Sequence, residues 1–233
     1  MIKITYKLIL LLGLLAMTVT SFAASEAEYG KVSKAWTLHA DGSQEYRSSM
    51  ELTLFTHTAM NSTYGESFIV YNPDFQTLKI HSSYTRQKDG TIVKTPDNAF
   101  VEVLPRFAAD APAYNQLKEM VVVHTGLELG ATIYLDYSII TKPGYYPALD
   151  INERLQETSP VKECKVSISV PENSPLAWQL LGSDAKASQA TRNGAKEVSW
   201  TLRNLPASSR EAFLPQNQDG IPRLIASSYS SNK

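Results

Sequence analysis

The chain has 233 residues, of which 43% are hydrophobic, and its 22 basic and 23 acidic side chains leave a net charge near zero. So mild a balance argues against nucleic acid or an anionic membrane surface as a partner, since both favour a basic face. The length suits one large all-β domain, or at most two small ones, and is enough to bury a sizeable core. The one cysteine excludes an internal disulfide, so the fold must depend on that core.

The beginning of the chain has the features of an export signal. A basic start, MIKITYK, precedes an uncharged apolar run at residues 8–19, and the small residues Ser21 and Ala23 stand where a signal peptidase would read them. The apolar run is shorter than the roughly 20 residues that a membrane span needs. We therefore predict a signal peptide at residues 1–23, a mature start at Ala24, and no integral membrane span after cleavage. The expected location is the periplasm or cell surface of a Gram-negative bacterium.

Apolar and polar residues alternate through most of the remaining chain, which is the pattern of half-buried strands. Asp41-Gly42 and Asp89-Gly90 each stand between two such runs and predict two β-hairpins. A third hairpin is expected over residues 120–142, with an apolar first arm and an alternating second arm. Later strands are expected at residues 161–170, 176–181 and 197–205.

Two stretches between these strands lack a clear period. Residues 94–119 form a long connection rich in alanine and proline, with a turn or two of helix expected after Pro112, and residues 143–159 form a second irregular stretch. Together, these patterns predict an all-β fold, an antiparallel two-sheet β-sandwich with long irregular connections and little helix. One domain would cover residues 24–226, followed by a polar tail at 227–233.

Several segments of the chain resemble a known bacterial family. They are GESFIVYNPDFQTLKI (65–80), SYTRQKDG (83–90), DNAFVEVLP (97–105), APAYNQLKEMVVVHTGLELG (111–130) and KPGYYPAL (142–149). Together they resemble the domain of unknown function that precedes transglutaminase-like domains in large secreted bacterial proteins. The resemblance covers nearly all of the expected mature chain. It implies an all-β fold, export, and an accessory role beside a papain-like cysteine catalytic domain, and it assigns no catalytic residue. The chain ends soon after its last expected strand, so a stand-alone form and a truncated form are both open.

The cysteine is a poor candidate for a nucleophile. A catalytic cysteine needs a histidine beside it, and transglutaminase-like domains place Cys, His and Asp in that chain order. All four histidines here precede Cys164, which shares strand parity with Val166 and Ile168. Free cysteine is among the most buried residue types, so we predict a structural role in the core.

Other reaction chemistry has no positive signal. Metal-binding spacings such as C-x-x-C and H-E-x-x-H are absent, as are glycine-rich phosphate loops. The acidic residues could form a carboxylate pair for glycoside hydrolysis, but nothing in their spacing requires it. We expect no cofactor, no metal site and no catalytic residues.

Aromatic residues in the loops are the candidates for binding. Tyr145 and Tyr146 follow Pro143-Gly144, and Phe107 and Tyr114 lie in the long connection. Rings on rigid loops can stack on sugars or anchor a protein partner, although for most of them we favour the alternative, in which the loop folds back and the ring caps the core. Adjacent rings seldom both point inward, so Tyr145 and Tyr146 are the stronger pair.

The sequence thus favours a non-catalytic, exported β-sandwich module. The first hypothesis for its role is positioning a transglutaminase-like catalytic domain, in the same chain or in another. The alternative is a stand-alone periplasmic protein that binds carbohydrate or peptide. A hydrolase with a carboxylate pair is a weaker third hypothesis.

Overall fold

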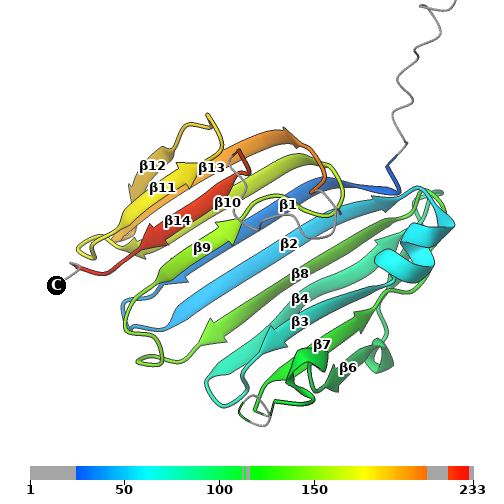
Figure 1. The fold of residues 1–233 in the computed structure, drawn as a ribbon, viewed down its shortest axis with the longest axis horizontal. Helices are drawn as coiled ribbons and strands as arrows, with labels where there is room; N and C mark the ends of the chain where they lie inside the picture. The colour runs from blue at the N-terminus through cyan, green and yellow to red at the C-terminus, as the bar shows by residue number, and fades with distance from the viewer. Residues whose placement is uncertain (1–24, 112, 114–115, 209–219, 231–233) are drawn as a thin grey trace, which may run out of the picture.

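The computed structural model describes residues 25–111, 113, 116–208 and 220–230, which form a layered β structure (Figure 1). Its helical elements are single turns at Ala59–Thr63, Asp97–Ala99 and Arg106–Ala108. The strands are β1 (Ala27–Leu38), β2 (Gln44–Leu54), β3 (Glu66–Tyr71), β4 (Gln76–Arg86), β5 (Ile92–Lys94), β6 (Phe100–Val103), β7 (Lys118–Val123), β8 (Thr132–Thr141), β9 (Asp150–Arg154), β10 (Val161–Pro171), β11 (Ala177–Leu181), β12 (Ser188–Arg192), β13 (Ala195–Leu205) and β14 (Arg223–Ser227).

One layer is a single eight-stranded sheet with the order β12-β13-β10-β1-β2-β8-β4-β5. The two hairpins predicted from Asp-Gly turns are confirmed as β1–β2 and β4–β5. Gly42 and Gly90 adopt φ of +84° and +91° in these turns, a conformation that glycine reaches without steric cost.

The first strand lies in the interior of this sheet. β1 pairs antiparallel with β2 on one side and parallel with β10 on the other, where Val32 lies opposite Cys164 and Trp36 opposite Ile168. The parallel pair is the one exception to the antiparallel arrangement among the strand pairs of the described residues. It joins two strands that are far apart in the chain.

The second layer consists of two separate three-stranded sheets, with the orders β11-β14-β9 and β3-β7-β6. Figure 1 shows both in front of the same face of the large sheet, one toward its β13–β10 side and one toward β8 and β4. The fold is therefore the expected all-β sandwich, with a second layer that is divided in two.

Each small sheet has its own core against the large one. Under β9 and β14, residues such as Ile151 and Leu224 pack with Cys164, Ile168 and other inward side chains of β10, β1 and β13. Under β3 and β7, Ile69 and Val122 pack with Leu135 of β8. Alternation of side chains along each strand directs these residues inward, as the periodicity predicted.

Three sequence predictions are wrong in detail. Residues 120–142 do not form a hairpin, because β7 pairs with β3 and β6 whereas β8 pairs with β2 and β4 in the other layer. The irregular stretch 143–159 contains β9, and the long connection 94–119 contains β6. Short strands of four or five residues carry too few alternations to be recognised by period.

Two predictions concern the ends of the chain. The expected leader, residues 1–23, lies outside the described residues. At the other end β14 runs to Ser227, and the backbone N–H of Ser228 donates to the carbonyl of Leu149 at 2.9 Å, so the expected tail begins within the folded part. No helix among the residues that the structure describes is long and apolar enough to span a membrane.

Cys164 is a core residue, as predicted. Its side chain is 1% exposed, and burial raises the pKa of its thiol to about 11. We expect slow reaction with a thiol reagent in the folded protein and fast reaction after denaturation. Cys164→Ser should lower the free energy of unfolding by about 1–3 kcal/mol, because the buried hydroxyl needs a partner. Rapid labelling of the native protein at neutral pH would contradict a core position.

Candidate functional site

Of the aromatic residues singled out from the sequence, Tyr145 and Tyr146 lie together in the structure. Tyr145 stacks on Phe75 with ring centroids 4.2 Å apart, and Tyr146 lies against Tyr145 at 4.6 Å. Phe107 is 64% exposed in the turn Arg106–Ala108, away in sequence from this trio. Tyr114 lies outside the described residues.

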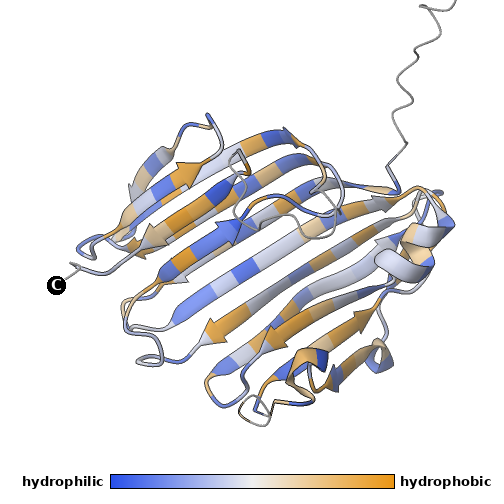
Figure 2. Ribbon diagram, viewed as in Figure 1, coloured by the Kyte–Doolittle hydropathy of each residue, from blue (hydrophilic) through white to orange (hydrophobic). Residues whose placement is uncertain are grey.

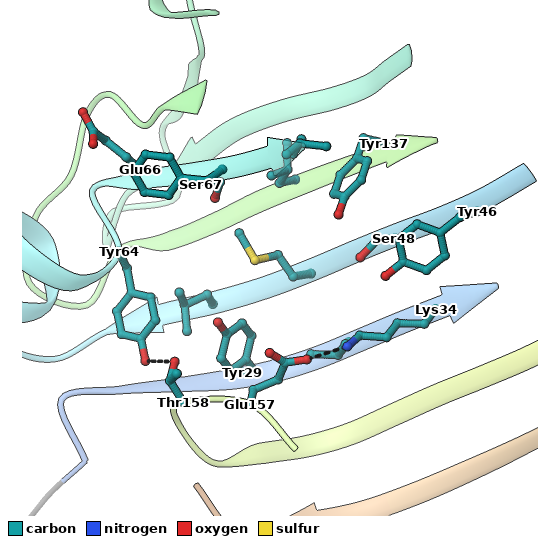
Figure 3. Close-up of a pocket in the computed structure, with 16 residues that line it drawn as sticks. Tyr29, Lys34, Tyr46, Ser48, Tyr64, Glu66, Ser67, Tyr137, Glu157 and Thr158 are labelled. Atoms are coloured by element: carbon teal, nitrogen blue, oxygen red, sulfur yellow. Dashed lines mark hydrogen bonds and ion pairs between the residues drawn. The ribbon is translucent and has the colours of Figure 1, made fainter. Parts of the chain in front are cut away.

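A cleft of about 500 Å³ opens between the two small sheets, over the middle of the large one. We call it the central cleft. Its floor is formed by inward side chains of β1, β2 and β8, and its walls are β3 and the segment that follows β9. Figure 3 shows its polar side chains. The residues lining it are Tyr29, Val32, Lys34, Tyr46, Ser48, Met50, Leu52, Tyr64, Glu66, Ser67, Phe68, Ile69, Leu135, Tyr137, Glu157 and Thr158.

A β-bulge at Gly30 helps to shape the floor. The register between β1 and β2 shifts between Tyr29 and Lys31, so Gly30 is an extra residue in β1. A regular strand would place Tyr29 and Lys34 on opposite faces, because side chains alternate. Because of the bulge, Tyr29 and Lys34 both point to the inner face. There the Tyr29 ring packs edge to face against the Tyr64 ring, with ring centroids 6.2 Å apart.

Lys34 is the charged centre of the cleft. Its side chain is 11% exposed, and its Nζ lies 2.7 Å from Oε1 of Glu153 and 3.0 Å from Oε1 of Glu157. Burial alone would lower the pKa of Lys34, but the carboxylates of Glu157 and Glu153 outweigh it and raise the pKa above its usual value. Lys34 is therefore charged at every physiological pH, and it ties the segment after β9 to the floor.

Hydroxyl groups cover much of the remaining floor and one wall. Burial raises the pKa of Tyr46 and of Tyr137, so both stay protonated and can donate hydrogen bonds. Figure 3 shows their hydroxyls near that of Ser48. On the wall, the Tyr64 hydroxyl lies 2.9 Å from Oγ1 of Thr158. A floor of rings and hydroxyls with a few charges suits binding more than it suits bond cleavage.

A second cavity, of about 470 Å³, shares the lining residue Tyr46 with the central cleft. Trp36 and Tyr46 line it, with ring centroids 5.2 Å apart, and Tyr146 and Tyr229 complete its aromatic lining. Among the aromatic candidates from the sequence that the structure describes, Tyr146 is the one that lines this cavity.

The walls of the central cleft end in strand edges. β3 is the terminal strand of one small sheet and β9 of the other. The backbone N–H of His124 donates to the carbonyl of Gly65 at 2.9 Å, and Gly65 lies opposite His124 in the β3–β7 register. Antiparallel pairing alternates, so the backbone groups of Glu66, Phe68 and Val70 point away from β7. Four consecutive β3 residues, Glu66 to Ile69, line the cleft. This is expected if the open edge of the strand faces the cleft, because residues pointing to either face of the sheet then border it.

The described part of the chain contains two serine–histidine hydrogen-bond contacts, but neither has the geometry of a nucleophile. Oγ of Ser138 lies 2.7 Å from Nε2 of His81. The Ser138 hydroxyl donates a hydrogen bond to Glu45, so the carboxylate contacts the serine and not the imidazole. Ser138 is also fully buried. Oγ of Ser67 lies 2.8 Å from Nε2 of His124, whose Nδ1 has no hydrogen-bond partner among the described residues. A catalytic triad needs the acid on the imidazole.

Two other polar side chains have structural roles. His124 is buried and hydrogen-bonded to Ser67. Asp136 forms a bidentate pair with Arg47 at 2.7 and 2.9 Å on the outer face of the large sheet. Within the described ranges, no group of three or more His, Cys, Asp or Glu side chains could hold a metal ion.

The central cleft could have been noticed in the sequence. Val32, Trp36 and Leu38 lie on one face of β1, and Lys34 occupies the same face between them. A charged residue on an inward face indicates either a buried ion pair or a place where the second layer is open. Its partners are 119 or more residues away in the chain, and no local pattern indicates them.

Comparison with known proteins supports the resemblance in part. The family model of DUF3857, a domain of unknown function with a solved structure, matches residues 40–209. The chain therefore belongs to the DUF3857 family. A search of curated proteins found no match.

Among solved structures, the chain is similar to a protein from Parabacteroides distasonis ATCC 8503 that is described as a putative protease. The two are 87% identical, with a TM-score of 0.85, and the match covers 88% of this chain and 41% of the other. This chain thus spans less than half of that protein, and more than half of that protein lies outside the match.

Tyr145 and Tyr146 can be tested as a contact face. Both are partly exposed and neither belongs to the two core clusters. Replacing both with alanine should change the free energy of unfolding by less than about 1 kcal/mol, because mainly the stacking on Phe75 is lost. Thermal unfolding measures this, and a drop of several kcal/mol would show that the rings cap the fold.

Proposed function

We propose that this protein is an exported, non-catalytic β-sandwich module that positions a transglutaminase-like catalytic domain, in the same polypeptide or in another. The observation that carries the proposal is the extent of the match to the Parabacteroides protein. A fold like this one makes up less than half of a longer chain, and that chain is described as a putative protease. A module with no catalytic set of its own, attached to a catalytic region, is most simply an accessory.

The buried state of the cysteine supports a role without chemistry. A cysteine nucleophile must be exposed and must form a thiolate near neutral pH. Cys164 is enclosed in the core, and its pKa is raised rather than lowered. The catalytic cysteine of the proposed assembly would belong to the partner domain.

The outer face of the β3-β7-β6 sheet supplies a surface for such a partner. Phe68 and Val101 both lie opposite Val121, so the three form one row across the sheet. Val103 and Phe107 extend the exposed apolar residues along the chain. Figure 2 shows hydrophobic stretches on β3 and β7. Apolar side chains gathered on one face are typical of an interface between domains.

Export remains part of the proposal. It is supported by the sequence of residues 1–23 and by a core that needs no disulfide. On this view the protein works in the periplasm or at the surface of a Gram-negative cell.

The test is a titration of the purified chain with a transglutaminase-like domain from the same genome, followed by NMR or calorimetry up to high concentration. Two domains that are normally linked can have weak free affinity, because linkage supplies a high effective concentration. We expect binding that Val101→Asp and Phe107→Ser weaken. The matched control is Ile92→Ser, an exposed apolar residue on β5 in the other layer. Absence of binding up to millimolar concentration would reject the accessory role.

A second function is favoured by the central cleft itself. A stand-alone protein that binds carbohydrate or peptide would need a groove with aromatic rings and hydroxyls, and Tyr29, Tyr46 and Tyr137 provide these. Binding of a glycan or a peptide, without any affinity for the catalytic domain, would promote this function over the first.

A further inference from the structure

We infer that the central cleft binds an extended, basic polypeptide segment, which adds as a strand to the free edge of β3. The inference rests on the proposed function only in taking the protein to be a binding module, and it names the class of ligand that the module holds. Three features carry it: the open edge, the divided second layer and the charge of the cleft.

The edge of β3 offers what a polypeptide backbone needs. The backbone groups of Glu66, Phe68 and Val70 point away from β7, and in the described part of the chain no strand pairs with this edge. Such groups recur at every second residue, which is the spacing on a partner strand. A sugar chain has no matching repeat of donors and acceptors, so this edge favours a peptide over a glycan.

The second layer is interrupted where the edge is open. The large sheet continues without interruption beneath both small sheets, but the layer above it stops at β3 and begins again at β9 (Figure 1). Between them lie Ser48 and Tyr137 on the floor, and no strand of the described residues covers these side chains. A strand added to β3 would lie above them and extend the second layer across the gap.

The charge of the cleft selects a basic ligand. Lys34 is its one cationic lining residue among those described, and its charge is already matched by Glu157 and Glu153 at 3.0 and 2.7 Å. Glu66 adds a third carboxylate at the rim, on the edge strand itself. The cleft therefore carries an excess of negative charge, which attracts lysine and arginine side chains and disfavours acidic ones.

The tyrosine floor fits such a ligand as well. Along an extended segment alternate side chains point to the same side, so every second side chain would face Tyr46, Tyr137 and Tyr29. Aromatic rings accept the aliphatic stems of lysine and can interact with its ammonium group. We expect a preference for peptides in which basic residues alternate.

The experiment uses the purified full chain and capped ten-residue peptides, observed by NMR and calorimetry. The first peptide alternates lysine and threonine, and the second replaces each lysine with glutamate. The third is the lysine peptide with methyl groups on the backbone nitrogens of four consecutive central residues. It keeps the charge and the side chains of the first peptide, but its four methylated residues have no backbone N–H to donate on either edge of the peptide strand. We expect the first to bind, and the third to bind about tenfold more weakly or worse, because at least two hydrogen bonds are lost.

A matched pair of variants tests the edge on the protein side. Phe68→Pro removes an N–H that points into the cleft and no hydrogen bond to β7, and proline is tolerated at such edge positions. Phe68→Ala removes the same ring and keeps the N–H. We expect Phe68→Pro to weaken binding of the lysine peptide about fivefold, because one hydrogen bond is lost, and Phe68→Ala to retain it. Glu66→Gln should weaken binding about threefold, as for an exposed ion pair.

Several outcomes would overturn the inference. They are equal binding of the lysine peptide and its methylated form, equal binding by the two Phe68 variants, or a cleft that responds to chitohexaose and to none of the peptides. Lack of binding by every probe rejects it as well. If Phe68→Pro fails to fold, the methylated peptide still decides the question. The proposed accessory role is judged separately, because its variants lie on the outer face and its probe is the catalytic domain.

Discussion

Lys34→Met should lower the free energy of unfolding by about 3–5 kcal/mol at pH 7, the largest single effect that we expect. Methionine preserves most of the apolar stem but removes the ammonium group that lies 2.7 and 3.0 Å from Glu153 and Glu157. Two partly buried carboxylates would then face each other without a counter-charge. Breaking a buried ion pair from one side carries this cost because the remaining charge stays desolvated.

Two further variants show whether the effect comes from charge. Combining Lys34→Met with Glu153→Gln and Glu157→Gln should recover most of the stability, since no unpaired charge then remains. As a control, Lys162→Met removes a lysine that pairs with Glu28 but is 64% exposed, and its cost should stay below about 1 kcal/mol. Urea denaturation measures all four proteins. A loss below about 1 kcal/mol for Lys34→Met would mean that water reaches the triad freely.

Acidification should produce the second large effect, through His124. Burial lowers the pKa of this imidazole from 6.5 to about 4. Below about pH 6.5 the unfolded chain takes up a proton on this residue and the folded protein does not, so stability falls as the pH falls toward 4. Above pH 6.5 the contribution is fully present. The difference between the pKa values of His124 in the unfolded and the folded protein corresponds to about 3 kcal/mol in the free energy of unfolding.

The contribution of His124 can be separated from that of the carboxylates, which titrate in part of the same range. His124→Asn should fold less stably at pH 7, because the contact with Ser67 changes, but its stability should decline less steeply between pH 6.5 and 4. His57→Asn, at an exposed position, should keep the steep decline of the unaltered protein. If stability declined in parallel with pH for all three proteins, His124 would have to take up its proton in the folded state over the same pH range as in the unfolded state.

The strands and the inward residues were largely predictable from local pattern. The hairpins β1–β2 and β4–β5 were indicated by alternation on both sides of an Asp-Gly turn, and the core position of Cys164 by its parity with Val166. The short strands β6 and β9 were not predicted, because four or five residues are too few to show a clear alternation of apolar and polar side chains. The pairing of β7 with β3 was also missed, since closeness in sequence favoured β8.

The central cleft was harder to foresee than the strands. Its floor and walls come from β1, β2, β3 and β8 and from the segment after β9, which meet only when the second layer divides into two sheets. Aromatic residues in loops were the natural candidates from the sequence. Three of the four tyrosines that line the cleft, Tyr29, Tyr46 and Tyr137, are instead on strands.

The parallel pairing of β1 with β10 has a consequence for biosynthesis. A ribosome completes β1 at Leu38, long before it reaches Val161, where the strand that covers the second edge of β1 begins. Until then β1 and β2 can form a hairpin whose outer side stays open, and open edges recruit other chains. Contacts between such distant segments also slow folding. The nascent protein therefore has to keep its first hairpin from aggregating until β10 has been made, and a chaperone that binds this segment would serve it best during that interval.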